Sequence, residues 1–483
     1  MDSSGIVFES VERNKAAYAG LSDDIWNYAE TGFMEERSAQ ALASALAARG
    51  FTIEKGLAGI GTAFSASWGR GAPVVAILGE FDALPGLSQA AGLPEKKELS
   101  PGANGHGCGH NLLGVGALAG AVAAKEYLES TGLPGTVRYF GCPGEEFGCG
   151  KTFMARAGVF ADADAALCWH PMDINAVWQA RTLANISVYF RFEGKASHAA
   201  ASPHLGRSAL DAVELTNVGA NFLREHIIPE ARLHYAITNS GGRAPNVVQA
   251  SAEVYYYCRA PRIAQAREIY ERLCDVARGA ALMTGTKLEI VLSQGLSDYA
   301  PNAALSDLLQ RCMEASGGPA FDDDDRELAR RFRATLSPQE IGATMGQLAF
   351  TQGAATVAAI GQDPLDAVIG PLFKGDVCLP GSTDVGDVSQ LVPTGQFVCA
   401  SAAIGTQAHS WQNAAQVGST IGHKGLLAAG RVLGLAAAEL FADPGIISGA
   451  KAEHKAKVPP YVCPIPENVT PEDVLASVQR ANP

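Results

Sequence analysis

Short apolar runs of strand length, set between stretches of helical spacing, constrain the fold of this chain more than any other feature. Four runs rich in aliphatic and aromatic residues lie far apart in the sequence. An Ala-rich stretch with the small and aliphatic residues of a tightly packed helix follows Gly114. This alternation predicts a buried α/β sheet covered by helices. The apolar runs are residues 73–78, 136–140, 165–169 and 397–403, and the Ala-rich stretch is residues 115–128.

The order of the expected elements changes between residues 183 and 294. There the pattern predicts strand, helix, strand, strand, helix and strand, an order that can fold by itself as a sheet covered by helices. A chain of 483 residues is also too long for one ordinary core. We therefore predict an α/β domain in two parts, residues 1–182 and 299–483, with an inserted α+β (βαββαβ) domain at residues 183–298. The elements of the insert are expected at residues 186–192, 206–225, 232–238, 247–257, 262–283 and 287–292.

Three further segments have a clear pattern. Apolar residues at helical spacing between residues 21 and 49, with Gly50 where a helix would stop, predict one or two helices near the start of the chain. The acidic run 322–325, which stands beside several arginines, is typical of a solvated helix start rather than of an ion site. From Pro444 onward the composition shifts to Lys, Pro and Glu, which predicts a surface tail.

The charge balance narrows the classes of partner. Lys and Arg number 37 and Asp and Glu 50, so the net charge of −13 offers no positive field to hold nucleic acid or an anionic membrane. No secretion signal opens the chain, and no apolar run reaches the roughly 18 residues that cross a bilayer. The ten cysteines have no paired spacing, as is typical of reduced thiols. We expect a cytoplasmic protein that acts on small molecules.

The strongest local signal for chemistry is the glycine-rich turn at residues 105–111. It holds Cys108 and His110, whose thiolate and imidazole can face one divalent cation. By itself the motif also fits a structural turn. Other candidate residues follow the predicted strands, however, and the carboxyl ends of strands in an open α/β sheet meet at one edge. These residues are Asp82 after the first run, Glu145 and Glu146 after the second, His170 after the third and His409 after the fourth.

Taken together, five of these side chains would supply metal ligands, a number that suits two cations sharing a water better than one cation. Such a pair lowers the pKa of the water and polarises a carbonyl, so amide hydrolysis is the expected reaction. Of the adjacent pair Glu145 and Glu146, one can bind metal while the other acts as a general base. Taken singly, each residue also fits a solvated turn or a hydrogen-bonded core histidine. The candidate ligands are Cys108, His110, Glu146, His170 and His409, and Asp82 is expected to orient one of them or to supply charge.

Six segments, in order along most of the chain, resemble the aminoacylase and carboxypeptidase-type metallo-amidohydrolases. The resemblance implies that Cys108 bridges two metal ions, that the other four ligands complete the coordination of these ions, and that Glu145 activates water. It also implies that the insert is a lid and dimerisation domain. The segments are residues 79–85, 105–111, 143–147, 169–171, 381–387 and 405–411.

The same resemblance implies roles for three residues of the insert. His198, in the segment 194–199, would reach a neighbouring active site and stabilise the oxyanion of the tetrahedral intermediate. Asn246 and Arg259 would hold the substrate carboxylate, which Arg can bind through two parallel hydrogen bonds. A surface histidine and a structural ion pair are the alternative interpretations of His198 and Arg259.

The sequence departs from the broader family at one position. A metal-binding His usually stands there two residues before the Asp that is Asp82, and this chain has Glu80 instead. The resemblance implies that His110 replaces the missing ligand. Thiolate and imidazole favour zinc, while carboxylates also accept manganese, so both metals are expected candidates.

We therefore expect a dinuclear metal-dependent amidohydrolase that cleaves the bond between an aromatic, p-aminobenzoyl-like acyl group and an amino acid such as glutamate. The acyl pocket is expected to involve residues 317–374. A homodimer or homo-oligomer is the simplest assembly, and a hetero-oligomer with a homologous partner chain is an alternative. Two other functions fit the sequence: a metal-independent hydrolase in which His110 or His106 activates Cys108 as nucleophile, and a catalytically silent binding component of a hetero-oligomer.

Overall fold

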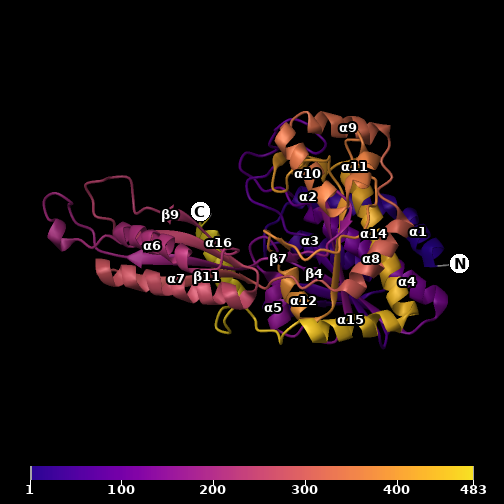
Figure 1. Cartoon of the computed structure of the whole chain (residues 1–483), viewed down its shortest axis with the longest axis horizontal. Helices are drawn as coiled ribbons and strands as arrows, with labels where there is room; N and C mark the ends of the chain where they lie inside the picture. The colour runs from indigo at the N-terminus through magenta and orange to yellow at the C-terminus, as the bar shows by residue number, and fades with distance from the viewer. Residues whose placement is uncertain (1–2, 482–483) are drawn as a thin grey trace.

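Seven strands form the central sheet of the larger of two bodies in the computed structural model, which describes residues 3–481 (Figure 1). They are β1 (Thr52–Lys55), β2 (Phe64–Arg70), β3 (Val74–Glu80), β4 (Gly135–Cys142), β5 (Ala165–Met172), β6 (Ala176–Val177) and β13 (Thr394–Ala400). The order is β1-β2-β4-β3-β5-β13-β6, and β4, β3, β5 and β13 are parallel to one another. The four predicted apolar runs form these central strands, although the last strand ends at Ala400 and not at residue 403.

Two long helices, α4 (His110–Thr131) and α14 (Thr420–Ala442), pack against each other and against this sheet. Small residues bring α4 close: a Cβ at Gly116 would stand 2.7 Å from the ring of Trp169. The expectation that no apolar run is long enough to cross a bilayer was wrong for α14, the one helix among residues 3–481 that is long and apolar enough, but 78% of its apolar window is buried inside the fold. Its hydropathy is therefore that of a core helix.

Shorter helices complete the larger body. They are α1 (Ser3–Arg13), α2 (Lys15–Tyr28), α3 (Glu36–Ala47), α5 (Gly150–Arg156), α8 (Ala303–Ser316), α9 (Asp323–Arg333), α10 (Pro338–Thr351), α11 (Ala354–Ile360), α12 (Val385–Leu391) and α13 (Trp411–Gln416). The helical pattern of residues 21–49 is thus two helices, α2 and α3. The acidic run is a helix start as predicted, with Asp322 as the cap of α9, but Asp325 is buried and pairs with Lys424 rather than facing solvent.

A narrower body, which we call the lid unit, projects from the larger one (Figure 1). It consists of β8 (Ala184–Glu193), α6 (Ala209–Leu223), β9 (Arg232–Asn239), β10 (Ser251–Ala260), α7 (Ile263–Thr284) and β11 (Lys287–Leu296). Its strands are antiparallel in the order β11-β8-β10-β9, and α6 and α7 pack on them. The predicted order of elements is confirmed. β10 begins four residues later than expected, because residues 240–250 form a loop, and α6 begins three residues later. The domain boundaries at residues 183 and 298 stay a prediction.

A two-stranded ladder joins β7 (Arg181–Thr182), just before the lid unit, to β12 (Cys378–Leu379).

The C-terminal segment is not the surface tail that its composition predicts. It forms α15 (Pro444–Lys457) on the larger body and α16 (Pro471–Ala481) beside β11 of the lid unit (Figure 1). Between them Ile465 is 2% exposed, and Arg267 of α7 donates a hydrogen bond to the carbonyl of Cys463 (3.0 Å). The prediction was wrong because a few apolar residues separated by prolines give no periodic pattern, yet some of them, such as Ile465, pack into the fold. The segment ties the lid unit to the larger body.

Candidate active site

The carboxyl ends of the parallel strands lie at one edge of the sheet, and the candidate residues collect there. β3 ends at Glu80, Glu145 and Glu146 follow β4, and His170 lies near the end of β5. The loop between β13 and α13 carries His409. Because parallel neighbours end at the same edge, residues that are far apart in the sequence come together.

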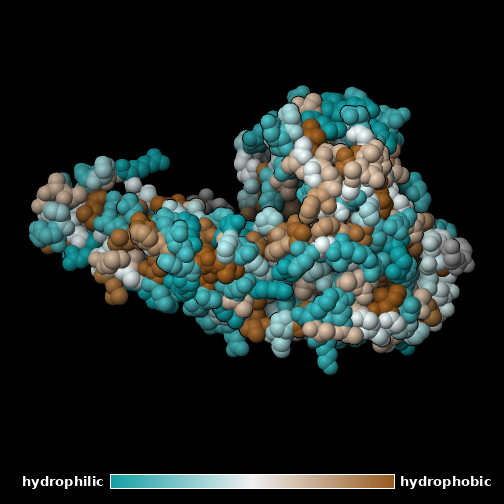
Figure 2. Space-filling model, in the orientation of Figure 1, coloured by the Kyte–Doolittle hydropathy of each residue, from teal (hydrophilic) through white to brown (hydrophobic). Residues whose placement is uncertain are grey.

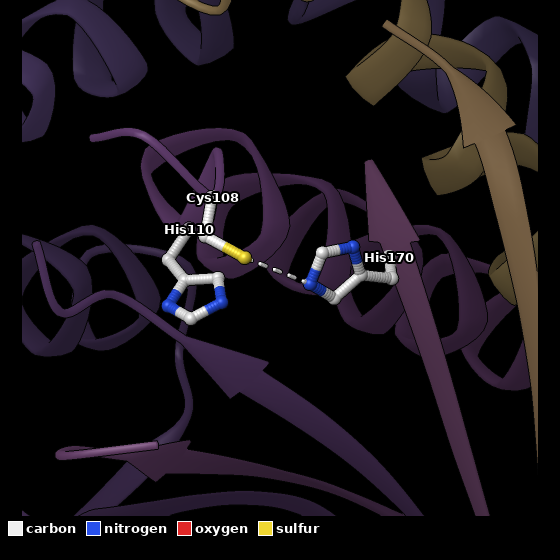
Figure 3. Close-up of side chains that lie close together, drawn as sticks. All are labelled: Cys108, His110 and His170. Atoms are coloured by element: carbon white, nitrogen blue, oxygen red, sulfur yellow. Dashed lines mark hydrogen bonds between the residues drawn. The ribbon is translucent and has the colours of Figure 1, made fainter. Parts of the chain in front are cut away.

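Cys108 and His110 lie at the start of α4, in the loop that the glycine-rich turn forms. Gly109 has φ of 80°, in the left-handed region, and a Cβ there would stand 2.8 Å from Cγ of Pro171. This close approach leaves Sγ of Cys108 3.4 Å from Nε2 of His170, with the ring of His110 beside them (Figure 3). One donor atom from each of Cys108, His110 and His170 lies within 4.8 Å of the others, so the three form one candidate metal group.

A second candidate metal group shares the same thiol. Donor atoms of Cys108, Glu146 and His409 also lie within 4.8 Å of one another. Nε2 of His409 is 3.2 Å from Oε1 of Glu146, and the His409 backbone N–H donates to the carbonyl of Gly107 (2.8 Å). His409 has φ of 60°, a left-handed conformation that costs a non-glycine residue roughly 1–2 kcal/mol. The arrangement is therefore that of two sites that share one sulfur.

Asp82 orients one of these ligands. Its Oδ1 is hydrogen-bonded to Nδ1 of His110 (2.9 Å), and its Oδ2 accepts from the backbone N–H of Glu146 (2.9 Å). A carboxylate on one ring nitrogen fixes the ring and leaves the other nitrogen as the ligand atom. Against the effect of burial, His110 holds the pKa of Asp82 below its usual value. Asp82 is thus a charged partner that aims Nε2 of His110 at the site.

The two adjacent glutamates have different surroundings. Burial, together with the charges of Glu80 and Glu146, raises the pKa of Glu145 well above its usual value. For Glu146, by contrast, His409 and His110 lower the pKa against the effect of burial. A raised pKa suits a general base that must accept a proton near neutral pH, whereas a permanently charged carboxylate suits a ligand.

Buried donor atoms that face one another without a well-formed hydrogen bond fit a site for divalent cations. Nε2 of His110 faces Oε2 of Glu80 (3.4 Å), and Oε1 of Glu146 faces Nε2 of His409 (3.2 Å). Among the described residues, these atoms of His110, Glu80 and Glu146 are buried and make no hydrogen bond of good geometry. Buried polar atoms almost always make hydrogen bonds, so three such atoms at a single place point to a bound group. These two pairs, and the pair of Sγ of Cys108 with Nε2 of His170, have their atoms 3.2 to 3.4 Å apart. That is the spacing of two ligands whose bonds to one ion are about 2.0–2.3 Å long. Thiol, imidazole and carboxylate together are a donor set for divalent metal ions.

A buried ion triad behind the site escaped the sequence analysis. Nζ of Lys151 lies 2.6 Å from Oε1 of Glu80 and 2.5 Å from Oδ1 of Asp384, and all three side chains are at most 2% exposed. The triad fixes Glu80, whose other oxygen stands 3.4 Å from Nε2 of His110. The one signal that could have found it is a lysine among glycines and apolar residues at the start of α5.

His106 has a structural role. Its Nε2 is hydrogen-bonded to the carbonyl of Ile25 in α2 (3.0 Å), and burial lowers its pKa to about 4. Burial also raises the pKa of the Cys108 thiol well above its usual value, the opposite of what activates a nucleophile. The geometry therefore does not favour the metal-independent hydrolase in which His106 activates Cys108.

The structure separates the three candidate residues of the lid unit. His198 and Asn246 are exposed neighbours at its far end, where the Ala199 N–H donates to the carbonyl of Asn246 (2.9 Å). Arg259 lies at the other end of β10, and its Nη1 donates to the carbonyl of Pro380 (3.0 Å). At about 3.4 Å per residue, roughly 25 Å of strand separates the two ends. Asn246 and Arg259 can therefore bind the same carboxylate only if they come from different chains.

Two donor groups that share a thiol, with a further carboxylate beside them at the carboxyl edge of an α/β sheet, are an arrangement typical of two-metal hydrolases. The sequence pattern of Peptidase family M20/M25/M40 matches residues 76–416. The chain belongs to this family, and it is an amidohydrolase.

Two relatives support this assignment, and one solved structure shares the fold. The chain is 47% identical to one of the component chains of p-aminobenzoyl-glutamate hydrolase from Escherichia coli, over 96% of this chain and 97% of that protein. It is 29% identical to the Xaa-Arg dipeptidase of Mus musculus over 93% of this chain and 91% of that protein. Its fold is similar to that of a dinuclear metal-binding peptidase of Bacillus subtilis, with a TM-score of 0.56 and 16% identity over 89% of this chain and 99% of that chain. The predicted α/β fold and the family resemblance are confirmed.

Proposed function

We propose that this protein hydrolyses N-acyl amino acids with two divalent metal ions bound by Cys108, His110, Glu146, His170 and His409. The observation that carries the proposal is the convergence of the donor atoms in two groups that share Cys108. When bound, the two ions would polarise the scissile carbonyl and lower the pKa of a water. Zinc suits the thiolate and imidazole ligands, and manganese suits the carboxylate, so zinc or manganese is the proposed metal.

Glu145 is the proposed general base. It would accept the proton of the attacking water and return it to the nitrogen of the leaving amino acid. Burial and the charges of Glu80 and Glu146 raise its pKa, the direction that suits a carboxylate that first takes and then gives a proton. Asp82 takes no part in this transfer and keeps His110 oriented through Nδ1.

The proposed substrate is an aromatic acyl group joined to glutamate, as in p-aminobenzoyl-glutamate. The first support is the 47% identity to a hydrolase that is named for this compound. The second is Arg259, whose Nε is buried without a hydrogen bond among residues 3–481 while its Nη1 is held by the carbonyl of Pro380. A fixed guanidinium with a free nitrogen is suited to a substrate carboxylate.

A panel of N-acyl amino acids tests this proposal. We expect p-aminobenzoyl-glutamate to be cleaved to equimolar p-aminobenzoate and glutamate, with a kcat/KM about tenfold or more above that of acetyl-glutamate. Chromatography of the products with time measures both. Preferential cleavage of Xaa-Arg dipeptides would change the substrate, and a metal-loaded protein that cleaves no member of the panel would refute the function.

We also propose that two copies pair through the lid unit. β9 is the outermost strand of its sheet and carries Ile237, which is 45% exposed. Phe222 of α6 is 70% exposed. Figure 2 shows apolar atoms, in brown, among the polar ones on one face of the lid unit. Exposed strand edges and apolar side chains are surfaces that other chains cover. A second copy could then bring His198 and Asn246 to the neighbouring site.

A hetero-oligomer is the alternative, since the Escherichia coli relative is named as one component of a larger hydrolase. From the composition and net charge, we also propose a cytoplasmic location without nucleic-acid or membrane partners.

A further inference from the structure

An apolar cavity of about 100 Å³ lies next to the metal-binding edge of the sheet, and no step of the proposed mechanism uses it. Its wall comes from the segment after β5, from β13, from α10 and from the loop before β12. Two aromatic rings take part in this wall. The residues that matter below are Met172, Ile174, Trp178, Phe373, Leu379 and Val398.

The register of two strands sets the distance from this cavity to the proposed centre. Val398 of β13 is the partner of His170 of β5, and Met172 follows His170 by two residues on the same face of the strand. Trp169 points to the opposite face, where its Nε1 donates to the carbonyl of Leu113 in α4 (2.9 Å). Neighbouring strands are about 4.8 Å apart. The cavity therefore begins one strand away from a proposed metal ligand.

The opposite wall of the cavity leads to the lid unit. Leu379 lines the cavity and precedes Pro380, whose carbonyl accepts from Nη1 of Arg259. One wall of the cavity thus begins a strand away from His170, a proposed metal ligand, and another wall adjoins the residue that holds Arg259.

We propose that this cavity is the subsite for the aromatic ring of the acyl group. The inference rests on the proposed function and names the residues that select its substrate. Trp178 and Phe373 offer ring faces and edges, which aromatic groups prefer as neighbours. The cavity is open on one side, so a six-membered ring can enter it without being fully enclosed. Phe373 and α10 come from residues 317–374, where the acyl pocket is expected.

Calorimetric titration of the metal-loaded protein with p-aminobenzoate, and separately with glutamate, tests the subsite without relying on turnover. In Trp178→Ala we expect the Kd of p-aminobenzoate to rise about tenfold and that of glutamate to change by less than about twofold. Trp68→Ala is the matched control, because Trp68 is also half-buried but lies on β2 against Lys125, outside the cavity. It is expected to leave both Kd values as in the unaltered protein.

A second variant keeps the test decisive if Trp178→Ala folds poorly. Ala176 of β6 lines the cavity and is the strand partner of Val398, so Ala176→Phe places a ring inside the cavity. In this variant we expect the Kd of p-aminobenzoate to rise by about tenfold or more and the Kd of glutamate to stay unchanged. Folded variants that bind p-aminobenzoate as the unaltered protein does would overturn the subsite, even where the unaltered protein hydrolyses p-aminobenzoyl-glutamate. Binding without hydrolysis would support the subsite and refute the function instead.

Discussion

Replacing Glu145 with Gln is expected to lower kcat for amide hydrolysis by about 10³-fold while the metal ions stay bound. Gln has almost the same shape as Glu but cannot accept the proton of the attacking water. Glu145 belongs to neither of the two groups that share Cys108, although its carboxylate forms a third group with Glu80 and His110. Its replacement by Gln therefore leaves the donor atoms of the two groups in place. Steady-state kinetics and the metal content of the same sample check both parts of this prediction.

Glu146→Gln is the matched control, one residue further along the chain. Glu146 faces His409 at 3.2 Å and belongs to a donor group, so this variant should lose metal as well as activity. An unchanged kcat in Glu145→Gln would remove Glu145 from the mechanism. Loss of metal from Glu145→Gln with metal retained in Glu146→Gln would reverse the two roles.

The Glu145→Gln variant also tests whether His198 of one copy acts in the active site of another copy. His198 follows the end of β8 and bridges Val247, at the opposite end of the lid strands from Arg259. If it acts in a neighbouring site, a mixture of Glu145→Gln and His198→Ala chains regains activity that neither variant has, because one mixed site keeps both residues. A mixture no more active than its parts, after exchange of chains between dimers is shown, would place His198 outside the reaction.

Replacing Lys151 with Met is expected to destabilise the fold by about 3–5 kcal/mol. Although burial alone would lower it, the carboxylates of Asp384 and Glu80 raise the pKa of Lys151 well above its usual value, so the side chain is charged. Its loss leaves two buried carboxylates without their shared cation. Urea unfolding at neutral pH measures the difference in free energy.

Two further variants separate the buried charge from general effects of the substitution. Lys15→Met removes an exposed lysine, with 58% of its side chain accessible, and should change stability by no more than about 0.5 kcal/mol. The double variant Lys151→Met with Asp384→Asn removes one charge of each sign and should recover part of the loss. A Lys151→Met protein as stable as Lys15→Met would show that the triad does not need its cation.

Much of the fold could be predicted because its central strands are buried on both faces. The runs that became β3, β4, β5 and β13 are continuous and apolar, and this signal needs no knowledge of partners. The rule that ligands collect at the carboxyl ends of such strands then brought Cys108, His170 and His409 into one hypothesis. The structure places their donor atoms in the two groups described above.

The features that escaped prediction depend on pairings between distant segments. Lys151 and Asp384 are 233 residues apart, and neither stands in a motif that indicates the other. The C-terminal segment packs through isolated apolar residues such as Ile465, which give no period to read. The separation of Asn246 from Arg259 follows from the length of β10, which a list of candidate residues does not contain. Sequence patterns identify elements and residue types, whereas these distances come only from the packed fold.

The metal content of the purified protein, compared with that of Cys108→Ser, tests the central claim most directly. Because the Cys108 sulfur belongs to both donor groups, we expect two divalent ions per chain in the unaltered protein and loss of both in the variant. Mass spectrometry of the metals per mole of protein gives the number, and hydrolysis before and after chelation links it to activity. A metal-free protein whose hydrolysis resists chelators would contradict the account and favour Cys108 as a nucleophile.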